Sequence, residues 1–299
     1  MTVSTHYEVL IMKKNQLMEK MIHGLFLVLG LTTVGCVLLI TVYLVISGIP
    51  AIREIGLVDF LFGKEWASTA SKPKYGILPF ILTSIYGTAG AILIGVPVGF
   101  ITAVYLSKLA SLKVKSVMQS AVSLLAGIPS VVYGLVGMLV LVPGIRKIFD
   151  VPDGASLLAA IIVLAIIILP SIIKMSITAL DAVPKEYEDA SLALGATPIE
   201  TYFKVSVPAA KSGIAAAVVL GVGRAIGEAM AVMMVAGNVP NMPNSLFQSV
   251  RFLTTAVSSE MAYSSGLQRQ ALFSIALVLF LFIMLINATL NFFLKREKE

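Results

Sequence analysis

Residues 25–46 read LFLVLGLTTVGCVLLITVYLVI, a run of 22 residues without a charge. A transmembrane α-helix needs about 20 mostly apolar residues to cross the roughly 30 Å hydrocarbon core of a bilayer. Hydrophobic residues make up 58% of the 299 positions and charged residues 13%, whereas a soluble domain carries roughly 25% charged residues. The composition therefore excludes an ordinary soluble enzyme. It also excludes a disordered chain, which needs low hydrophobicity and high charge.

Five further apolar stretches follow the first one, each long enough to cross a membrane. They lie within residues 74–108, 115–146, 153–174, 212–237 and 269–295. The first run is longer than the apolar core of a signal peptide, and no small-residue cleavage motif follows it, so we expect it to be retained. The sequence therefore predicts an all-α integral membrane protein with six transmembrane helices.

The distribution of basic residues predicts the orientation. Six spans place both termini on the same side, and that side carries 13 Lys and Arg residues against 8 on the other. Lys and Arg accumulate in cytoplasmic loops, so both termini are expected in the cytoplasm. Because the basic residues flank apolar runs, the net charge of +6 does not indicate a nucleic-acid partner. His6, His23 and Cys36 are too few for a metal cluster or a disulfide framework, so no metal site is expected.

Two spans contain glycines four residues apart, Gly95/Gly99 and Gly223/Gly227. Small residues at this spacing allow membrane helices to approach closely. We therefore expect both glycine pairs to face neighbouring helices.

The loop at residues 186–208 has the pattern of a folded unit. Small and apolar residues recur at helical spacing between Tyr187 and Leu194, and Gly195 is placed to end that helix in a left-handed conformation. Thr197-Pro198-Ile199-Glu200 has the pattern of a capping box that starts a second helix. Such a helix–turn–helix suits docking into a cleft on a soluble partner, although a connector lying on lipid headgroups is equally compatible with these residues.

The same loop resembles the permease loop of ATP-driven importers, which reads EAA, three residues, G, nine residues, I-x-L-P. This chain keeps every spacing, with Asp for Glu, Ser for the second Ala, and Val for Ile and Leu. In that family the loop is the coupling helix that seats in the ATPase subunit. The resemblance implies that the coupling contacts are made by Asp189, Ala190, Ser191, Gly195, Val207 and Pro208. ATP and Mg are then expected on the partner, because this chain has no G-x-x-x-x-G-K-[ST] loop.

The fifth span contains two charged residues, Arg224 and Glu228. A charge near the bilayer centre costs about 2.5–3.5 kcal/mol on insertion scales, so it must face protein, water or a ligand. The two side chains could neutralise each other one helical turn apart. Alternatively, the Arg224 guanidinium could bind a tetrahedral oxyanion in transit. Glu228 would then keep the anion from binding too tightly and could accept a hydrogen bond from a P–OH group, which sulfate lacks.

The surroundings of this pair resemble phosphate permeases of the PstC type. The resemblance lies in residues 223–238 of the fifth span, in residues 126–134 of the third span, and in the outer segments 60–66 and 75–79. One departure is Ala229, where PstC-type chains usually have threonine. This resemblance implies the fold of a type I ABC importer permease with a MetI-like transmembrane domain.

The same resemblance implies a function and partners. The chain would move inorganic phosphate across a bacterial or archaeal cytoplasmic membrane by alternating access, without being an enzyme itself. Its partners would be a PstA-type permease, two copies of a PstB-type ATPase, a PstS-type phosphate-binding protein and membrane lipid. The expected division of the chain is a cytoplasmic tail at 1–24, the first span with a periplasmic loop at 25–75, the transmembrane core at 76–294, and a cytoplasmic tail at 295–299.

Three alternatives remain open from the sequence. A permease for another oxyanion, such as sulfate or molybdate, would have the same architecture. An ion-coupled secondary transporter would need broken helices in paired repeats and would not explain the spacing within residues 189–208. An intramembrane enzyme would need an acid–base or nucleophile constellation, and only Arg224 and Glu228 are ionisable within the predicted spans.

Overall fold

The computed structural model describes the backbone of residues 2–296 and the side chains of residues 18–289 and 292. The described chain is helical apart from its loops and one short hairpin, β1 (Trp66–Ala67) and β2 (Lys74–Tyr75). The α-helices are α1 (Thr2–Ile55), α2 (Leu57–Phe62), α3 (Leu78–Val104), α4 (Leu112–Gly127), α5 (Ser130–Val136), α6 (Val142–Phe149), α7 (Leu157–Asp181), α8 (Lys185–Ala193), α9 (Pro198–Thr201), α10 (Val207–Ala209), α11 (Lys211–Gly227), α12 (Met230–Val235), α13 (Leu253–Glu260) and α14 (Gly266–Arg296). Three π-helical turns continue α3, α5 and α9, namely η1 (Tyr105–Leu109), η2 (Gly137–Leu141) and η3 (Tyr202–Ser206).

The spans follow the prediction of an all-α membrane protein. In the described chain, 5 helical segments are long and apolar enough to cross a bilayer, and a sixth is reached if a pair of helices bent by 71° counts as one span. The five are Met18–Ile55, Leu78–Leu109, Ser130–Phe149, Leu157–Asp181 and Gly266–Thr289, and the bent pair is Pro198–Ala209 with Lys211–Gly227. The predicted tails and loops stay predictions, and residues 297–299 lie outside the described part of the chain.

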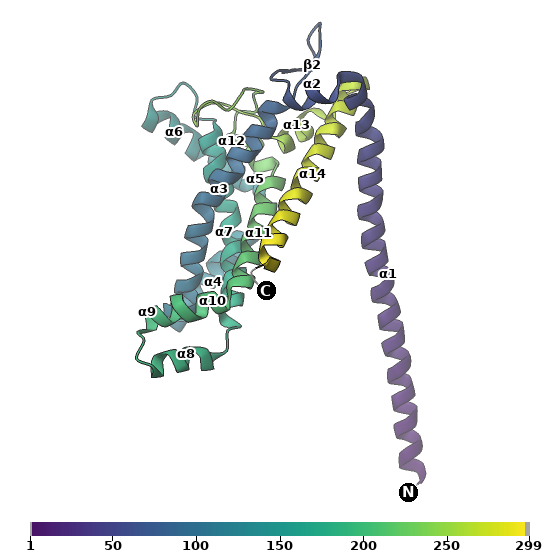
Figure 1. Ribbon diagram of the computed structural model, residues 1–299, viewed down its shortest axis with the longest axis vertical. Helices are drawn as coiled ribbons and strands as arrows, with labels where there is room; N and C mark the ends of the chain where they lie inside the picture. Colours follow the sequence, from purple (N-terminus) through teal and green to yellow (C-terminus); the bar gives the residue numbers. More distant parts are fainter. Residues whose placement is uncertain (1, 297–299) are drawn as a thin grey trace.

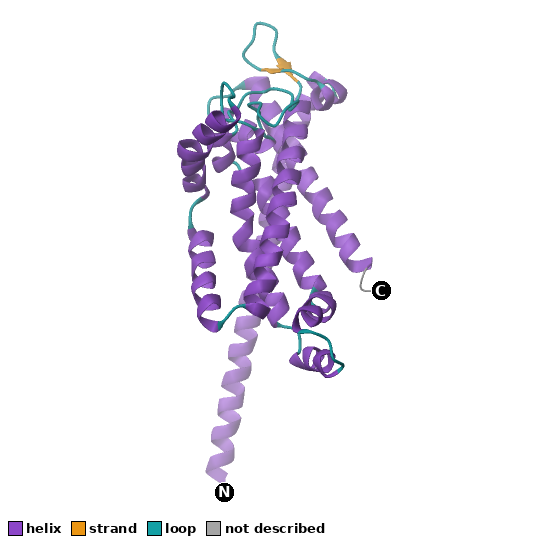
Figure 2. Cartoon of the chain, turned by 90° about the vertical axis from the view of Figure 1, so that its left-hand side faces the viewer, coloured by secondary structure: helices purple, strands orange, loops and turns teal. Residues whose placement is uncertain are grey.

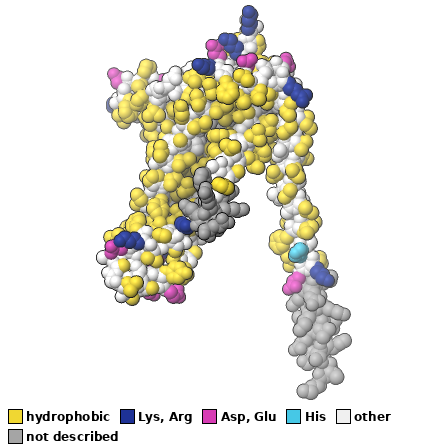
Figure 3. Space-filling view, in the orientation of Figure 1, with side chains coloured by type: hydrophobic (Ala, Val, Ile, Leu, Met, Phe, Trp, Pro, Cys, Tyr) yellow, Lys and Arg dark blue, Asp and Glu magenta, His cyan; other side chains and the backbone are white. Residues whose placement is uncertain are grey.

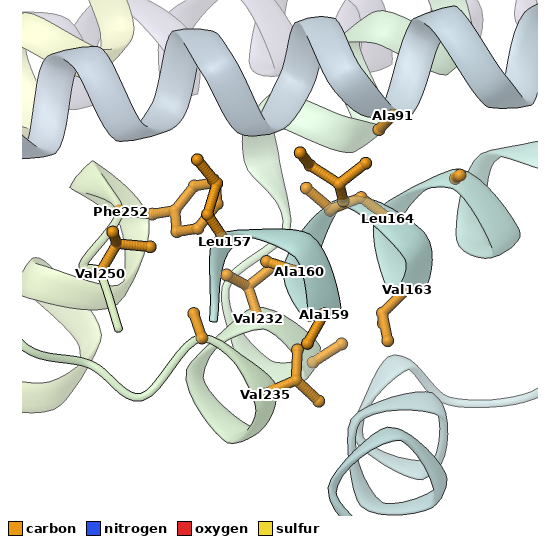
Figure 4. Packing of buried hydrophobic residues seen from close by; sticks show 14 of the residues in the cluster. Ala91, Leu157, Ala159, Ala160, Val163, Leu164, Val232, Val235, Val250 and Phe252 are labelled. Atoms are coloured by element: carbon orange, nitrogen blue, oxygen red, sulfur yellow. The ribbon is translucent and has the colours of Figure 1, made fainter. Parts of the chain in front are cut away.

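Helix α7 is the centre of the bundle. In its most apolar window 67% of the residues are buried, the largest share of any candidate span described. Its first turns pack against α12, Phe252 and Ala91 in the main apolar core (Figure 4). Helix α3 lies against α7 at Gly95 and Gly99, where an added Cβ would come within 2.7 and 2.9 Å of Ile168 and Ile172. The predicted close packing of the first glycine pair is confirmed.

The two ends of the molecule are built from different elements, and charged side chains gather at both. The hairpin, α2, α6 and α13 lie at one end, and α8 and α9 lie at the other, on the same side as the N-terminus (Figure 1). In the view turned by 90° the long helices run between the same two ends (Figure 2). Charged side chains gather at these ends and apolar side chains cover the middle (Figure 3). This is the charge distribution of a membrane-spanning bundle.

Over the side chains that the structure describes from Met18 on, helix α1 contacts the bundle only in its last turns. The Ser274 hydroxyl of α14 donates a 2.6 Å hydrogen bond to the Gly48 carbonyl, and the rings of Tyr43 and Phe273 meet edge to face at 5.4 Å. From Met18 to Ile40 every side chain is exposed, and α1 diverges from the other helices (Figure 1). The apolar surface of α1 is therefore left for lipid or a partner chain.

One carboxylate fastens the hairpin end. Glu260, the last residue of α13, accepts hydrogen bonds from Trp66 Nε1 at 3.2 Å, Ser68 Oγ at 3.3 Å and Gln268 Nε2 at 3.0 Å. It also forms an ion pair with Arg251, and the two side chains are 20% and 14% exposed. Three separate segments, the hairpin, the loop before α13 and the start of α14, are joined at this point.

Candidate functional site

The charged pair of the fifth span lies at a break in the helix. A single helix with Arg224 and Glu228 one turn apart is the sequence-based expectation, and it is wrong at Glu228. Helix α11 ends at Gly227, Glu228 has extended backbone (φ −71°, ψ 127°), and α12 begins at Met230. The Glu228 amide still donates to the Ala225 carbonyl of α11 at 3.4 Å, whereas the Glu228 carboxylate and carbonyl bond to residues beyond α11.

The hydrogen bonds of this pair exclude mutual neutralisation. Arg224 Nη1 donates to Ser171 Oγ of α7 at 3.1 Å. Glu228 Oε1 accepts from the Ala231 amide at 3.1 Å and so holds the start of α12, while the Glu228 carbonyl accepts from Thr254 Oγ1 at 2.8 Å. Among the described side chains, neither residue belongs to an ion pair within 4.0 Å. Arg224 is half-buried, and its guanidinium therefore has no carboxylate partner within the described chain although it is partly removed from solvent.

The space beside this break is open. A Cβ added at Gly223 or Gly227 would meet no atom within 4 Å, and the same holds for Gly127 at the end of α4. The expectation that the second glycine pair packs against a neighbouring helix is therefore wrong for this chain. These glycines leave room next to Arg224.

The third predicted span contains a second break. Ile128 and Pro129 separate α4 from α5, and Tyr133 donates a 2.8 Å hydrogen bond across the break to the Leu125 carbonyl. The half-helices after the two breaks pack together, since a Cβ added at Gly134 would lie 2.8 Å from the Cα of Ala231. Irregular backbone at membrane depth occurs where it is buried in protein or lines a water-filled cavity. The two breaks therefore lie where half-helices of the third and fifth predicted spans meet.

The loop after α7 is the folded unit that the sequence predicts. Helix α8 is followed by Gly195 with φ +87°, the left-handed conformation expected there. Thr197 Oγ1 accepts from the Glu200 amide at 3.3 Å, and Glu200 Oε2 accepts from the Thr197 amide at 3.1 Å, which completes the capping box of α9. The predicted helix–turn–helix is confirmed.

The predicted coupling residues differ in where they lie. Four of them are on the surface, namely Asp189, Ala190, Gly195 and Pro208. Ser191 is half-buried and its hydroxyl lies 2.9 Å from that of Thr201, which joins α8 to α9. Val207 packs against the apolar cluster at the inner ends of α3 and α7. The surface of the loop also exposes apolar side chains: Leu194 is 90% exposed and Ile199 61%.

A half-buried ion pair joins this loop to the second span, and sequence reasoning missed it. Lys108 Nζ lies 2.6 Å from Glu188 Oε1, and the two side chains are 11% and 17% exposed. Ser206 also donates to Glu188 Oε1 at 2.8 Å. The only signal in the sequence is opposite charge on residues 80 positions apart, which does not identify a contact. Sequence reasoning also missed Ser171, the partner of Arg224, because nothing in the sequence shows which distant residue lies beside Arg224.

Known proteins share both the sequence and the fold. Residues 95–298 match the family described as the inner membrane component of binding-protein-dependent transport systems. The probable ABC transporter permease protein YqgH of Bacillus subtilis is 42% identical over 256 residues, which cover 83% of each chain. The phosphate transport system permease protein PstC of Haemophilus influenzae is 35% identical over 262 residues, covering 81% of this chain and 82% of that one.

The solved structures show the fold. The MetNI methionine ABC transporter in an inward-facing conformation is similar with a TM-score of 0.55 at 21% identity, over 74% of this chain and 94% of that chain. An amino acid ABC transporter solved with histidines is similar with a TM-score of 0.53 at 21% identity, over 74% and 92%. With the family match, the fold and the relatives in agreement, the chain belongs to the inner membrane components of binding-protein-dependent transport systems, as a non-catalytic, multi-pass permease subunit of an ABC importer that works with an ATPase and a binding protein.

Proposed function

We propose that this chain is the PstC-type permease of an importer that moves inorganic phosphate into the cell by alternating access. The observation that carries the proposal is the Arg224 guanidinium, half-buried at the break in the fifth span and without a carboxylate partner in the described chain. Relatives named PstC, 35% and 33% identical to this chain, support phosphate as the substrate.

The chemistry of the site suits a tetrahedral oxyanion. A guanidinium is permanently charged and presents its N–H groups in a planar fork that matches phosphate geometry. One Arg224 nitrogen is held by Ser171, which fixes the orientation of the fork and leaves its other N–H groups for the anion. Glu228 Oε1 is occupied by the start of α12, so we assign the acceptance of a P–OH hydrogen bond to its second oxygen.

The partners follow from the same proposal. A PstA-type permease would lie beside this chain and complete the pathway, and two PstB-type ATPases would dock below the pair. One ATPase would contact residues 186–208 through Asp189, Ala190, Gly195 and Pro208, which lie on the surface of the loop. A PstS-type protein would deliver phosphate at the hairpin end. Both termini would then lie in the cytoplasm, on the side of α8 and α9.

ATP hydrolysis by the complex that co-purifies with this chain, in lipid nanodiscs, tests the proposal. A loaded PstS-type binding protein should stimulate hydrolysis with phosphate and leave it unchanged with sulfate. Arg224→Ala should abolish phosphate uptake in proteoliposomes, and Glu228→Gln should weaken the discrimination against sulfate. Stimulation by sulfate or molybdate instead would assign the importer to another oxyanion. If no ATPase co-purified under mild solubilisation, the coupling role of residues 186–208 would be refuted.

A further inference from the structure

Helix α7 carries an exposed lysine, Lys174, within the length of its candidate span. The sequence-based prediction ends the fourth span at Lys174, but α7 continues to Asp181. Lys174 therefore lies seven residues before the end of the helix, about 10 Å along its axis at 1.5 Å per residue. Ser171, the partner of Arg224, lies three residues earlier and hence on the same face of α7, about 4.5 Å deeper.

Polar side chains of α4 lie opposite this face. Gln119 and Ser123 line a cavity of about 270 Å³ together with Lys174 and Thr178 of α7. Gln119 and Ser123 also line a larger hollow of about 720 Å³ along α4, with Ser116 and Ser120. The two spaces share Gln119 and Ser123 and therefore adjoin, and together they are here called the α4–α7 groove; Val122 and Ile177 also line its smaller part.

The groove lies between the level of the charged site and the C-terminal end of α7. Ser171, which accepts the hydrogen bond from Arg224, lies one helical turn before Lys174 on α7 and lines neither of the two spaces. At its outer end, Lys115 and Asp181 form an ion pair at 3.0 Å, and Ser107 donates to Asp181 at 2.6 Å. Asp181 is therefore already engaged at the mouth of the groove.

The groove offers donors to an anion. Lys174, Gln119 and Ser123 use no side-chain hydrogen bond or ion pair within the described chain. An ammonium group, an amide NH2 and a hydroxyl are all donors, and none of the described residues lining the cavity is acidic. A lysine inside a membrane span is expensive unless it faces a water-filled cavity or an anion.

We propose that Lys174 is the second cationic group on the phosphate pathway. Phosphate leaves Arg224, is bound by Lys174 with Gln119 and Ser123, and passes from there to the cytoplasm. Two cations in sequence keep the anion from being trapped at one site, because the second attracts the anion as the first releases it. This inference rests on the proposed phosphate transport. It adds a second binding residue and the path that phosphate takes from Arg224 to the cytoplasm.

The test uses the complete complex in proteoliposomes, with ATP inside and phosphate-loaded binding protein outside. Radiolabelled phosphate uptake and ATP hydrolysis are measured together. Lys174→Gln should lower maximal uptake about tenfold, the loss expected from one charge-assisted hydrogen bond, with an unchanged half-saturating concentration of binding protein. Lys174→Arg should keep most of the uptake. Lys113→Gln removes an exposed lysine near the start of α4 that does not line the groove, and it should match the wild type.

A relocated charge gives the sharpest readout. Gln119 lines the same cavity from the opposite helix, so Lys174→Gln combined with Gln119→Lys returns an ammonium to the groove and should restore uptake. Wild-type uptake in Lys174→Gln, as expected of a lysine that only reaches the lipid headgroups, would overturn the proposal. An equal loss in the double variant would also overturn it.

Two controls separate the possible failures. If Lys174→Gln does not assemble, Ser123→Ala should still lower uptake about threefold, and wild-type uptake in that variant would refute the groove. If the wild-type complex takes up another oxyanion and no phosphate, the proposed function fails and the Lys174 proposal falls with it. Phosphate uptake by the wild type with no effect of either variant refutes only the groove.

Discussion

The two ends of this permease are each held by one half-buried carboxylate, and the two carboxylates are used differently. At the hairpin end, Glu260 joins Trp66, Ser68, Arg251 and Gln268. At the other end, Glu188 joins only Lys108 and Ser206 among the described residues, and no side chain of α8 is buried.

This difference distinguishes a rigid end, here called the cap (the segments joined at Glu260), from a loop with fewer polar attachments, here called the lever (residues 186–208). Several segments interlocked around Glu260 move together or not at all, since each bond restricts the others. Within the described chain, helix α8 is held to the second span by one ion pair, and the loop exposes Tyr187, Leu194 and Ile199. Exposed apolar patches of this kind mark protein interfaces. We infer that the bundle supplies little of the loop's burial and that the ATPase supplies the rest.

The largest effect is expected from removing the carboxylate of Glu260 at the hairpin end, which tests whether this end is more firmly held than the other. Glu260→Gln leaves the Arg251 guanidinium, 14% exposed, without a counter-charge, so the free energy of unfolding should fall by about 3 kcal/mol. Denaturation in mixed micelles measures this. Glu65→Gln breaks an exposed ion pair with Lys74 at the same end and should change it by less than about 0.5 kcal/mol. Equal losses in both variants would mean that Glu260 is no more than a surface residue.

The docking surface of the lever gives the next largest effect. Leu194→Asp places a charge on a side chain that is 90% exposed, so folding should be unaffected while binding of the ATPase weakens about 30-fold, or about 2 kcal/mol. Co-purification and binding isotherms check this. Tyr263→Asp changes a side chain that is 92% exposed near the hairpin end and should leave ATPase binding unchanged. Unaltered binding in Leu194→Asp would remove the loop from the interface.

The single attachment of the lever predicts uncoupling. Glu188→Gln removes the charge that holds Lys108, so ATP hydrolysis should continue while phosphate uptake per ATP falls about tenfold. The ratio of the two rates in proteoliposomes is the measurement. Lys204→Gln breaks only the exposed pair with Glu200, and its ratio should equal that of the wild type. A proportional fall of both rates in Glu188→Gln would mean that the ion pair serves stability rather than coupling.

The smallest effect concerns the cap of α9. Thr197→Ala removes the side chain that accepts from the Glu200 amide and should destabilise the short helix locally by about 1 kcal/mol, seen as faster amide exchange over residues 198–206. Hydrogen bonds from Thr197 and the charge of Lys204 lower the pKa of Glu200 below its usual value. The stabilisation from Glu200 is therefore present above its unfolded pKa and is lost as the pH falls through the lowered folded pKa. Protection factors over residues 198–206, which correct for the pH dependence of the intrinsic exchange rate, should fall in acid, and unchanged protection factors would contradict this.

Local features could be derived from the sequence because their causes lie within a few residues. The apolar runs, the left-handed Gly195 and the capping box at Thr197 depend on side-chain hydrophobicity and on hydrogen bonds between near neighbours. The close approach of a helix at Gly95 and Gly99 was also predicted, because small residues at that spacing allow helices to pack closely, but the same spacing at Gly223 and Gly227 leaves open space in this chain.

The sequence by itself determined a helical membrane protein, the caps of the helix–turn–helix at residues 186–208 and its resemblance to ABC importer permeases. Only the tertiary structure decided that α11 breaks at Glu228, that Ser171 holds Arg224 and that Lys108 meets Glu188. It also placed Lys174 inside α7 and left the face of Gly223 open. The physical reason is that each of these features depends on which distant segment packs alongside. The spacing of residues along one helix does not identify that segment.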